Sequence, residues 1–101
     1  MNKSNKKPRN IELYEAILTL KTLDECTKFF DDLCTVSELR AMEQRFEVAR
    51  LLNAGHIYNE ILESTGASSA TISRVNRSLQ YGADGYSVVF DRLGPFKEEK
   101  D

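Results

Sequence analysis

The sequence is poor in the residues from which metal centres and nucleophilic active sites are built. It contains one histidine, His56, and two cysteines, Cys26 and Cys34, and it has no tryptophan. A structural metal site needs about four close ligands, which three scattered residues cannot supply. Nucleophilic catalysis needs a base beside the nucleophile, and the hydroxyl-rich segment 68–71 has no general base near it in the sequence. We therefore expect no metal, no cofactor and no enzymatic activity.

Long apolar segments are also missing. No apolar run approaches the roughly 18 residues that a membrane-spanning helix needs. Residues 1–9 are charged and have no apolar stretch behind them, unlike a secretory signal. We therefore expect a cytoplasmic protein that does not enter membranes and whose two cysteines are reduced. The length of 101 residues favours a single domain.

Charge is low overall but unevenly distributed. The net charge is −2 and the isoelectric point is about 5.4, which argues against indiscriminate binding to nucleic acids. Basic residues gather in an N-terminal arm and in the middle of the chain, and acidic residues dominate the segment between them. We expect a flexible basic arm over residues 1–9, one helical domain over 10–95 and a charged tail over 96–101. The arm either touches the DNA backbone or minor groove, or it serves as a solvated tail.

Hydrophobic residues recur at helical spacing along most of the chain. The pattern predicts helices over residues 10–21, 22–33, 35–54, 58–65 and 68–80. Thr22 and Ser68 are suitable N-caps, and Thr35 with Glu38 forms the sequence pattern of a capping box. The last apolar segment, 86–93, fits either a short helix or an extended segment. Because strand signals are otherwise absent, the sequence predicts an all-α fold.

Residues 57–80 have the organisation of a helix-turn-helix, in which the second helix enters the major groove of DNA. Gly66 supplies the turn, because a positive φ costs glycine little. Four apolar residues are spaced to face inward: Ile61, Ile72, Val75 and Leu79. Two positions depart from the usual motif, since Leu62 stands where a small residue is common and Ile57 where a capping Ser or Thr is expected.

The other face of the second helix is small, hydroxylated and basic, with no acidic residue. Small and hydroxyl side chains allow close approach to base edges, and Ser, Thr and Arg bond to phosphates. We expect seven residues to face DNA: Ser68, Ser69, Ala70, Thr71, Ser73, Arg74 and Arg77. We assign Ser69, Ala70 and Ser73 to base edges. Thr71, Arg74 and Arg77 are assigned to phosphates, or to bases if the helix rolls. The pattern also fits a helical hairpin whose Ser/Thr face is only solvated.

A family resemblance rests on residues spread over 35–80. They are Thr35, Glu38, Arg45, Leu52, Gly55, Gly66-Ala67, Ala70-Thr71-Ile72, Arg74, Ser78 and Leu79, to which Tyr81-Gly82 and Asp84-Gly85-Tyr86 are added. This part of the chain resembles the tryptophan repressor superfamily, and the whole chain resembles its TrpR-like YerC/YecD branch. The resemblance implies a Trp-repressor-like helical bundle that forms an intertwined homodimer. It also implies two reading helices about 34 Å apart on a near-palindromic double-stranded operator, as in the Trp repressor and other helix-turn-helix dimers.

The resemblance further implies an effector pocket between two arginines. These are matched here by Arg45 and Arg74, and Thr35 matches a further pocket residue. The residue after the second arginine is glycine in the repressor and leaves room for the indole, whereas here it is Val75. A β-branched side chain there would fill much of that space. We therefore expect that tryptophan is not the effector. Either another ligand is the effector, or the protein has none. Arg45 also fits an ordinary solvated or ion-paired helix residue.

Two functions from different classes fit these observations. The first is a homodimeric, sequence-specific transcriptional regulator of the repressor type, which binds double-stranded DNA through the helix at 68–80. The second is a dimeric protein-interaction module whose apolar surfaces bind a partner protein and whose helix-turn-helix is only a scaffold. Salt-dependent binding to duplex DNA separates the two.

Overall fold

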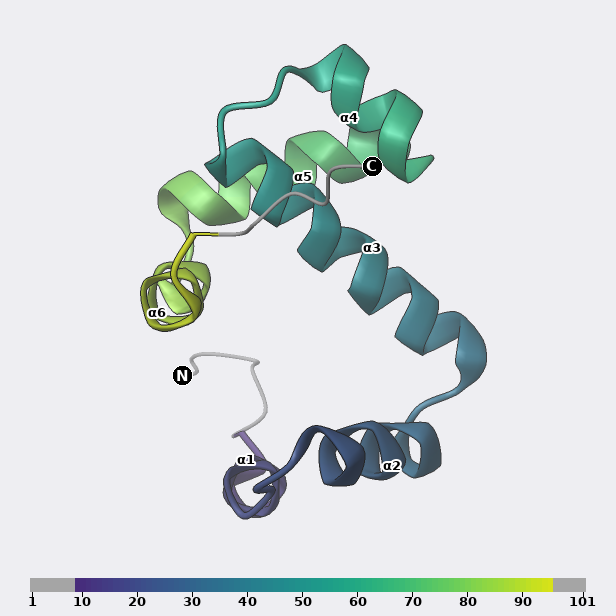
Figure 1. Cartoon of the computed structure of the whole chain (residues 1–101), viewed down its shortest axis with the longest axis vertical. Helices are drawn as coiled ribbons and strands as arrows, with labels where there is room; N and C mark the ends of the chain where they lie inside the picture. Colours follow the sequence, from purple (N-terminus) through teal and green to yellow (C-terminus); the bar gives the residue numbers. More distant parts are fainter. Residues whose placement is uncertain (1–8, 96–101) are drawn as a thin grey trace, which may run out of the picture. The chain divides into compact units, whose positions relative to one another are not determined.

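The computed structural model describes residues 9–95, and all regular secondary structure in that range is helical. Six helices follow one another along the chain (Figure 1): α1 Ile11–Leu18, α2 Leu23–Leu33, α3 Val36–Asn53, α4 Tyr58–Thr65, α5 Ser69–Tyr81 and α6 Gly85–Leu93. The predicted all-α fold is thereby confirmed.

The chain divides into two compact units, with the boundary inside α3. Within the described residues, the N-terminal unit runs to Leu39 and the C-terminal unit begins at Arg40. The sequence predicts that residues 10–95 form one domain. Whether the two units join into that domain stays a prediction. The predicted basic arm, apart from Arg9, and the predicted charged tail over 96–101 lie outside the described residues.

The predicted helix caps are confirmed. The Thr22 hydroxyl accepts a hydrogen bond from the backbone N–H of Glu25 at 3.0 Å, which caps α2. At the start of α3, the Thr35 hydroxyl accepts from the N–H of Glu38 at 3.1 Å, and the Thr35 N–H donates to the Glu38 carboxylate at 2.8 Å. These reciprocal bonds satisfy backbone donors that a helix start would otherwise leave unpaired.

The first helix is shorter than predicted. The apolar pattern indicated residues 10–21, but α1 ends at Leu18. Both the N–H and the hydroxyl of Thr19 donate to the carbonyl of Ala16, at 3.1 and 2.6 Å. This tightened last turn uses i to i−3 bonds in place of the α-helical ladder, so the chain leaves the helix before the Thr22 cap of α2.

The last apolar segment, which the sequence left open between two conformations, is helical. Within α6, the rings of Tyr86 and Phe90 stack with their centroids 5.8 Å apart. The Phe90 ring also lies 5.6 Å from that of Phe46 on α3. One helical turn separates Tyr86 from Phe90, so a helix places both rings on the face that packs against the core.

The buried core lies in the C-terminal unit and joins three helices with the α4–α5 turn. Its members are Val48, Ala49 and Leu51 of α3, Ile61 of α4, Ala67 of the turn, and Ile72 and Val75 of α5. All are apolar, and Val48, Ile61 and Ile72 have no solvent-exposed surface. Burial of several branched side chains at one junction fixes α4 and α5 on α3.

The N-terminal unit has a different character, because neither α1 nor α2 contains a buried residue. Leu18 is 83% exposed and Leu23 is 80% exposed. Ile11 and Tyr14 are exposed as well, and with Leu18 they follow the i, i+3, i+7 spacing of one helix face. These side chains are therefore not covered by the unit itself, whereas others, such as Ile17 and Phe29, are half-buried.

Two glycines give contrasting predictions for stability. Gly66 has φ +70°, and a Cβ there would meet nothing within 4 Å, so Gly66→Ala should cost only the left-handed strain, about 1–2 kcal/mol. A Cβ on Gly82 would lie 2.4 Å from the Ser78 carbonyl oxygen, so Gly82→Ala should lower the free energy of unfolding further because the backbone must move. Urea denaturation measures both changes.

Gly85→Ala is the matched control for these substitutions. A Cβ on Gly85 has open space around it and the residue begins α6, so alanine there should be neutral or stabilising by up to about 1 kcal/mol. A loss at Gly85 as large as the loss at Gly82 would contradict the steric explanation.

Candidate nucleic-acid interface

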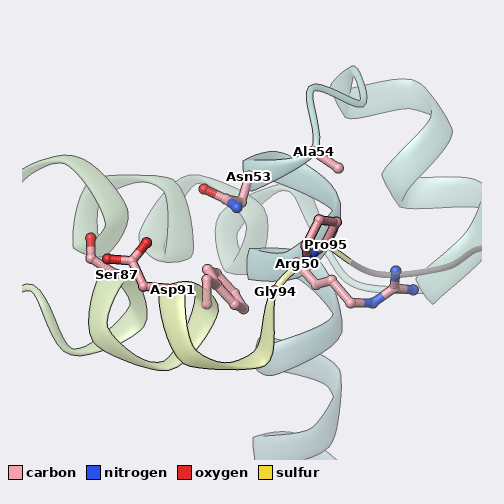
Figure 2. Close-up of a pocket in the computed structure, with 8 residues that line it drawn as sticks. Arg50, Asn53, Ala54, Ser87, Asp91, Gly94 and Pro95 are labelled. Atoms are coloured by element: carbon pink, nitrogen blue, oxygen red, sulfur yellow. The ribbon is translucent and has the colours of Figure 1, made fainter.

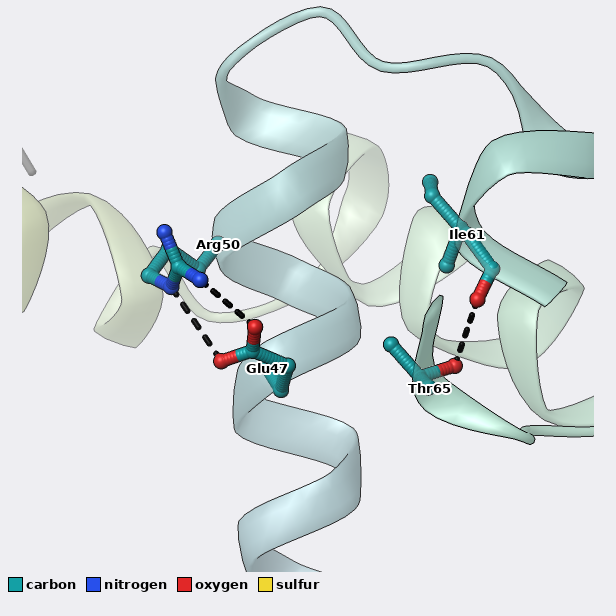
Figure 3. Close-up of polar contacts among 4 residues, drawn as sticks. All are labelled: Glu47, Arg50, Ile61 and Thr65. Carbon is teal, nitrogen blue, oxygen red and sulfur yellow. Dashed lines mark hydrogen bonds and ion pairs between the residues drawn. The ribbon is translucent and has the colours of Figure 1, made fainter. Parts of the chain in front are cut away.

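The turn between α4 and α5 is a compact, hydrogen-bonded corner. Gly66 takes the left-handed conformation, with φ 70° and ψ 8°, and its N–H donates to the carbonyl of Leu62 at 3.0 Å. The Thr65 hydroxyl donates to the Ile61 carbonyl at 2.7 Å, as Figure 3 shows, and accepts from the N–H of Ala67 at 3.1 Å. One side chain therefore links the end of α4 to the residue that follows the glycine.

The predicted inward-facing residues hold this corner against α3. Ile61, Ile72 and Val75 are buried, and Leu79 is half-buried against the same core. Leu62 also packs against the core, so the unit accommodates it where the motif usually has a small residue. The inward face predicted from the sequence is confirmed.

The start of α4 is weakly capped, as its sequence indicated. Ile57 provides no side-chain acceptor, and its N–H lies 3.4 Å from the carboxylate of Glu60. The same carboxylate oxygen lies 3.4 Å from Nδ1 of His56. The single histidine therefore sits at the α3–α4 junction beside a carboxylate that also serves the helix start.

The outer face of α5 presents most of the residues predicted to meet DNA. Ser69, Ala70, Ser73, Arg74 and Arg77 are exposed, and Thr71 is half-buried. Ser68 is exposed too, but its hydroxyl accepts from the N–H of Thr71 and donates to the Thr71 hydroxyl, both at 3.1 Å. Ser68 therefore serves α5 as its N-cap. The DNA contacts themselves stay a prediction.

Within residues 9–95, no carboxylate neutralises the positive charge of α5. The helix contains Arg74 and Arg77 and no acidic residue, and no carboxylate among residues 9–95 forms an ion pair with either arginine. Arg50 of α3 differs, because its Nε and a terminal nitrogen both donate to Glu47 (Figure 3). The guanidinium groups of α5, in contrast to that of Arg50, are thus available to an anion.

A hollow of about 330 Å³ lies beside the N-terminal half of α5. Its lining residues are Ala41, Gln44 and Arg45 of α3 and Ala70, Thr71 and Arg74 of α5. The two arginines assigned to an effector pocket are therefore placed together, with no acidic residue in the lining. Val75 is buried in the core and Thr35 belongs to the N-terminal unit, and neither is among these lining residues.

A larger hollow of about 510 Å³ lies between the C-terminal end of α3 and α6. Ser87 and Asp91 line one side of it, and Figure 2 shows the Arg50 guanidinium directed away from both. Because Arg50 is already bonded to Glu47, the charges in this hollow do not converge on a common point. The acid-free face of α5 is the stronger candidate for an interface with an anion.

Gln44 was not anticipated as a functional residue. Its Nε2 donates to the backbone carbonyl of Thr65 at 3.2 Å, which joins α3 to the end of α4 across 21 positions of sequence. In the sequence, Gln44 is one polar residue among many on the long helix. No local pattern indicates this contact.

The structure also reports on two other classes of site. Among residues 9–95, no group of three or more His, Cys, Asp or Glu side chains is placed to hold a metal ion. Cys26 and Cys34 are free and half-buried. Over the same residues, no helix has both the length and the apolar character needed to span a bilayer.

Comparison with known proteins identifies the relatives of this chain. The protein YerC of Bacillus subtilis strain 168, described as uncharacterised, is 54% identical over 82 residues, which is 81% of this chain and 79% of YerC. A crystal structure from Staphylococcus aureus described as a candidate Trp repressor is 49% identical, with a TM-score of 0.81 over 87% of this chain and 88% of that one. A TrpR-like protein from Eubacterium eligens is 56% identical, with a TM-score of 0.82 over 87% and 91% of the two chains.

The family model for the Trp repressor protein matches residues 11–94, which include all six helices. Its members are regulators rather than enzymes, and the match indicates a DNA-binding regulator. These comparisons show that the chain belongs to the Trp repressor family.

Proposed function

We propose that this protein is a homodimeric, sequence-specific transcriptional regulator that reads the major groove of double-stranded DNA with α5. The observation that carries the proposal is the combination, on one helix, of a buried apolar face and an exposed face with two arginines and no acid. The relationship to the Trp repressor supports repression as its mode of action.

In this proposal the exposed residues of α5 divide their roles by size and charge. Ser69, Ala70 and Ser73 lie against base edges, because short side chains allow the helix to approach the groove floor. Arg74 and Arg77 bond to phosphates, which contribute affinity without reading sequence. Thr71 is half-buried and reaches a phosphate from the side of the helix.

The proposed dimer uses the uncovered apolar faces of the N-terminal unit. A second copy of the chain offers the same faces, so α1 and α2 of two subunits can bury one another in the intertwined arrangement of the family. Two copies of α5 would then meet successive major grooves about 34 Å apart on a near-palindromic site, as in other helix-turn-helix dimers.

The groove assignment predicts the effect of removing the two arginines of α5. Arg74→Ala with Arg77→Ala should weaken specific duplex binding on the order of 100-fold, because two charge-assisted contacts per subunit are lost. The slope of log affinity against log salt should also fall by about 2 per subunit. Fluorescence anisotropy over a salt series, with a duplex selected from a random library, measures both quantities.

A variant of equal charge change serves as the control. Lys28→Ala with Arg92→Ala removes two exposed cations, one from α2 and one from α6, outside the reading helix. It should retain nearly all of the affinity. Unchanged binding in the α5 variant would refute the groove assignment.

The proposed dimer predicts that charge on the exposed stripe of α1 dissociates the subunits. Tyr14→Lys with Leu18→Lys should move the protein from dimer to monomer at micromolar concentration, because burial of unpaired ammonium groups opposes association. Sedimentation velocity measures the change. Glu12→Lys, which makes the same change of two charges at an exposed position about 100° around the helix from Ile11, is the control and should stay dimeric.

Measurements of dimerisation and of duplex affinity on the wild-type protein also separate the regulator from the alternative function. A wild-type protein that dimerises but has no affinity for any duplex would support a protein-interaction module and would overturn the proposed function. Wild-type protein that is monomeric at these concentrations would refute the dimer.

We also predict that tryptophan is not the effector. Val75 directly follows Arg74 and is buried in the core with 2% exposure, so a branched side chain stands where the glycine of the repressor leaves room for the indole. Isothermal titration of the protein with L-tryptophan should show no micromolar binding. Micromolar binding that is lost in Arg45→Ala would contradict this prediction.

A further inference from the structure

The conformation of the α4–α5 turn is set locally, but its position on the unit is not. The Thr65 hydroxyl bonds to Ile61 and Ala67, and Gly66 bonds to Leu62, so these contacts stay within seven residues of sequence. They determine the shape of the corner. They do not determine where the turn lies relative to α3, against which α5 packs.

Gln44 of α3 makes a contact that does fix the position of the turn relative to α3. Its side chain is half-buried on α3, and Nε2 donates to the Thr65 carbonyl at 3.2 Å. Thr65 directly precedes the left-handed glycine from which the chain enters the Ser68 cap and α5. Gln44 also lines the hollow beside α5 together with the adjacent Arg45. It therefore touches the turn from the same side on which the reading helix begins.

The apolar core does not make this contact redundant. Contacts between Ile61, Ile72 and Val75 and the residues of α3 are non-directional, so they resist separation of the helices more than small sliding. A hydrogen bond has narrow limits on distance and angle. Bonds to base edges require the reading side chains to be placed within about half an ångström, whereas long arginine side chains can follow a displaced phosphate.

We propose that Gln44 is a positioning residue for DNA reading, which fixes the α4–α5 turn on α3 and thereby sets where α5 meets the bases. This inference rests on the proposed function. Its consequence is that Gln44 contributes to the discrimination between duplexes and not to the electrostatic affinity that all duplexes share.

The test compares the affinity for a selected duplex with that for a scrambled duplex of equal length. Gln44→Met keeps the length of the side chain and removes the donor, so the ratio of the two affinities should fall roughly threefold to tenfold, the equivalent of one hydrogen bond. The slope against salt should not change, because no phosphate contact is removed. Gln44→Lys restores a donor of similar reach and should restore the ratio of affinities. The added charge should raise the affinity for both duplexes by the same factor, so it should not change the ratio.

Gln80→Met is the matched control, because the amide of Gln80 bonds at 3.4 Å to Asn76 within α5 itself. It should leave the ratio unchanged. If Gln44→Met retains the wild-type ratio, or weakens binding to both duplexes by one common factor, the inference is overturned and the proposed function stands. If the wild-type protein discriminates between no duplexes, the proposed function fails, and the inference fails with it.

Discussion

The packing of Ile61, Ile72 and Val75 against α3 is the constraint on which the rest of the C-terminal unit depends. The three side chains are buried together with Val48 and Ala49, so α4 and α5 each have a single face that can lie against α3. Once Ile72 and Val75 face inward, the helical repeat turns the serines and arginines of α5 outward. Which residues of α5 are exposed thus follows from which residues are buried. The Gly66 turn only has to allow the arrangement of α4 and α5 that the core packing favours.

Features that arise within one or two helical turns were predictable from the sequence. The Ser68 cap and the Thr35–Glu38 capping box join residues three positions apart, so the residue types themselves indicate the bonds. The inward stripe of α5 follows from a period of 3.6 residues in the same way. The early end of α1 was missed, because the hydroxyl of Thr19 competes locally for the Ala16 carbonyl while the apolar pattern continues past it.

Features that depend on distant residues were not predictable. The bond from Gln44 to Thr65 spans 21 positions, and glutamine on an exposed-looking helix carries no sign of its partner. The helical state of α6 was not predictable for the same reason. Its sequence has no decisive preference for helix or extended chain, and its contact with Phe46 of α3 comes from a distant part of the sequence. The N-terminal unit gives a further example. Its apolar pattern predicted helices correctly, but it could not show that Leu18 and Leu23 stay exposed within the unit.

The charge distribution explains why placement of α5 matters more here than it would in a strongly basic protein. The chain carries a net charge of −2, whereas α5 contains two arginines and no acid. Under the proposed function, the net negative charge limits the general attraction to DNA, and the few phosphate contacts of α5 do little to hold the protein on a wrong sequence. Under the proposed function, occupancy of a site must come from base contacts made by the short side chains of Ser69 and Ser73, which have almost no reach with which to correct a displaced helix. If the proposed function holds, specificity depends on how rigidly the α4–α5 turn is held on α3. The buried isoleucines hold the turn by packing, and the directional hydrogen bond of the Gln44 amide adds to this.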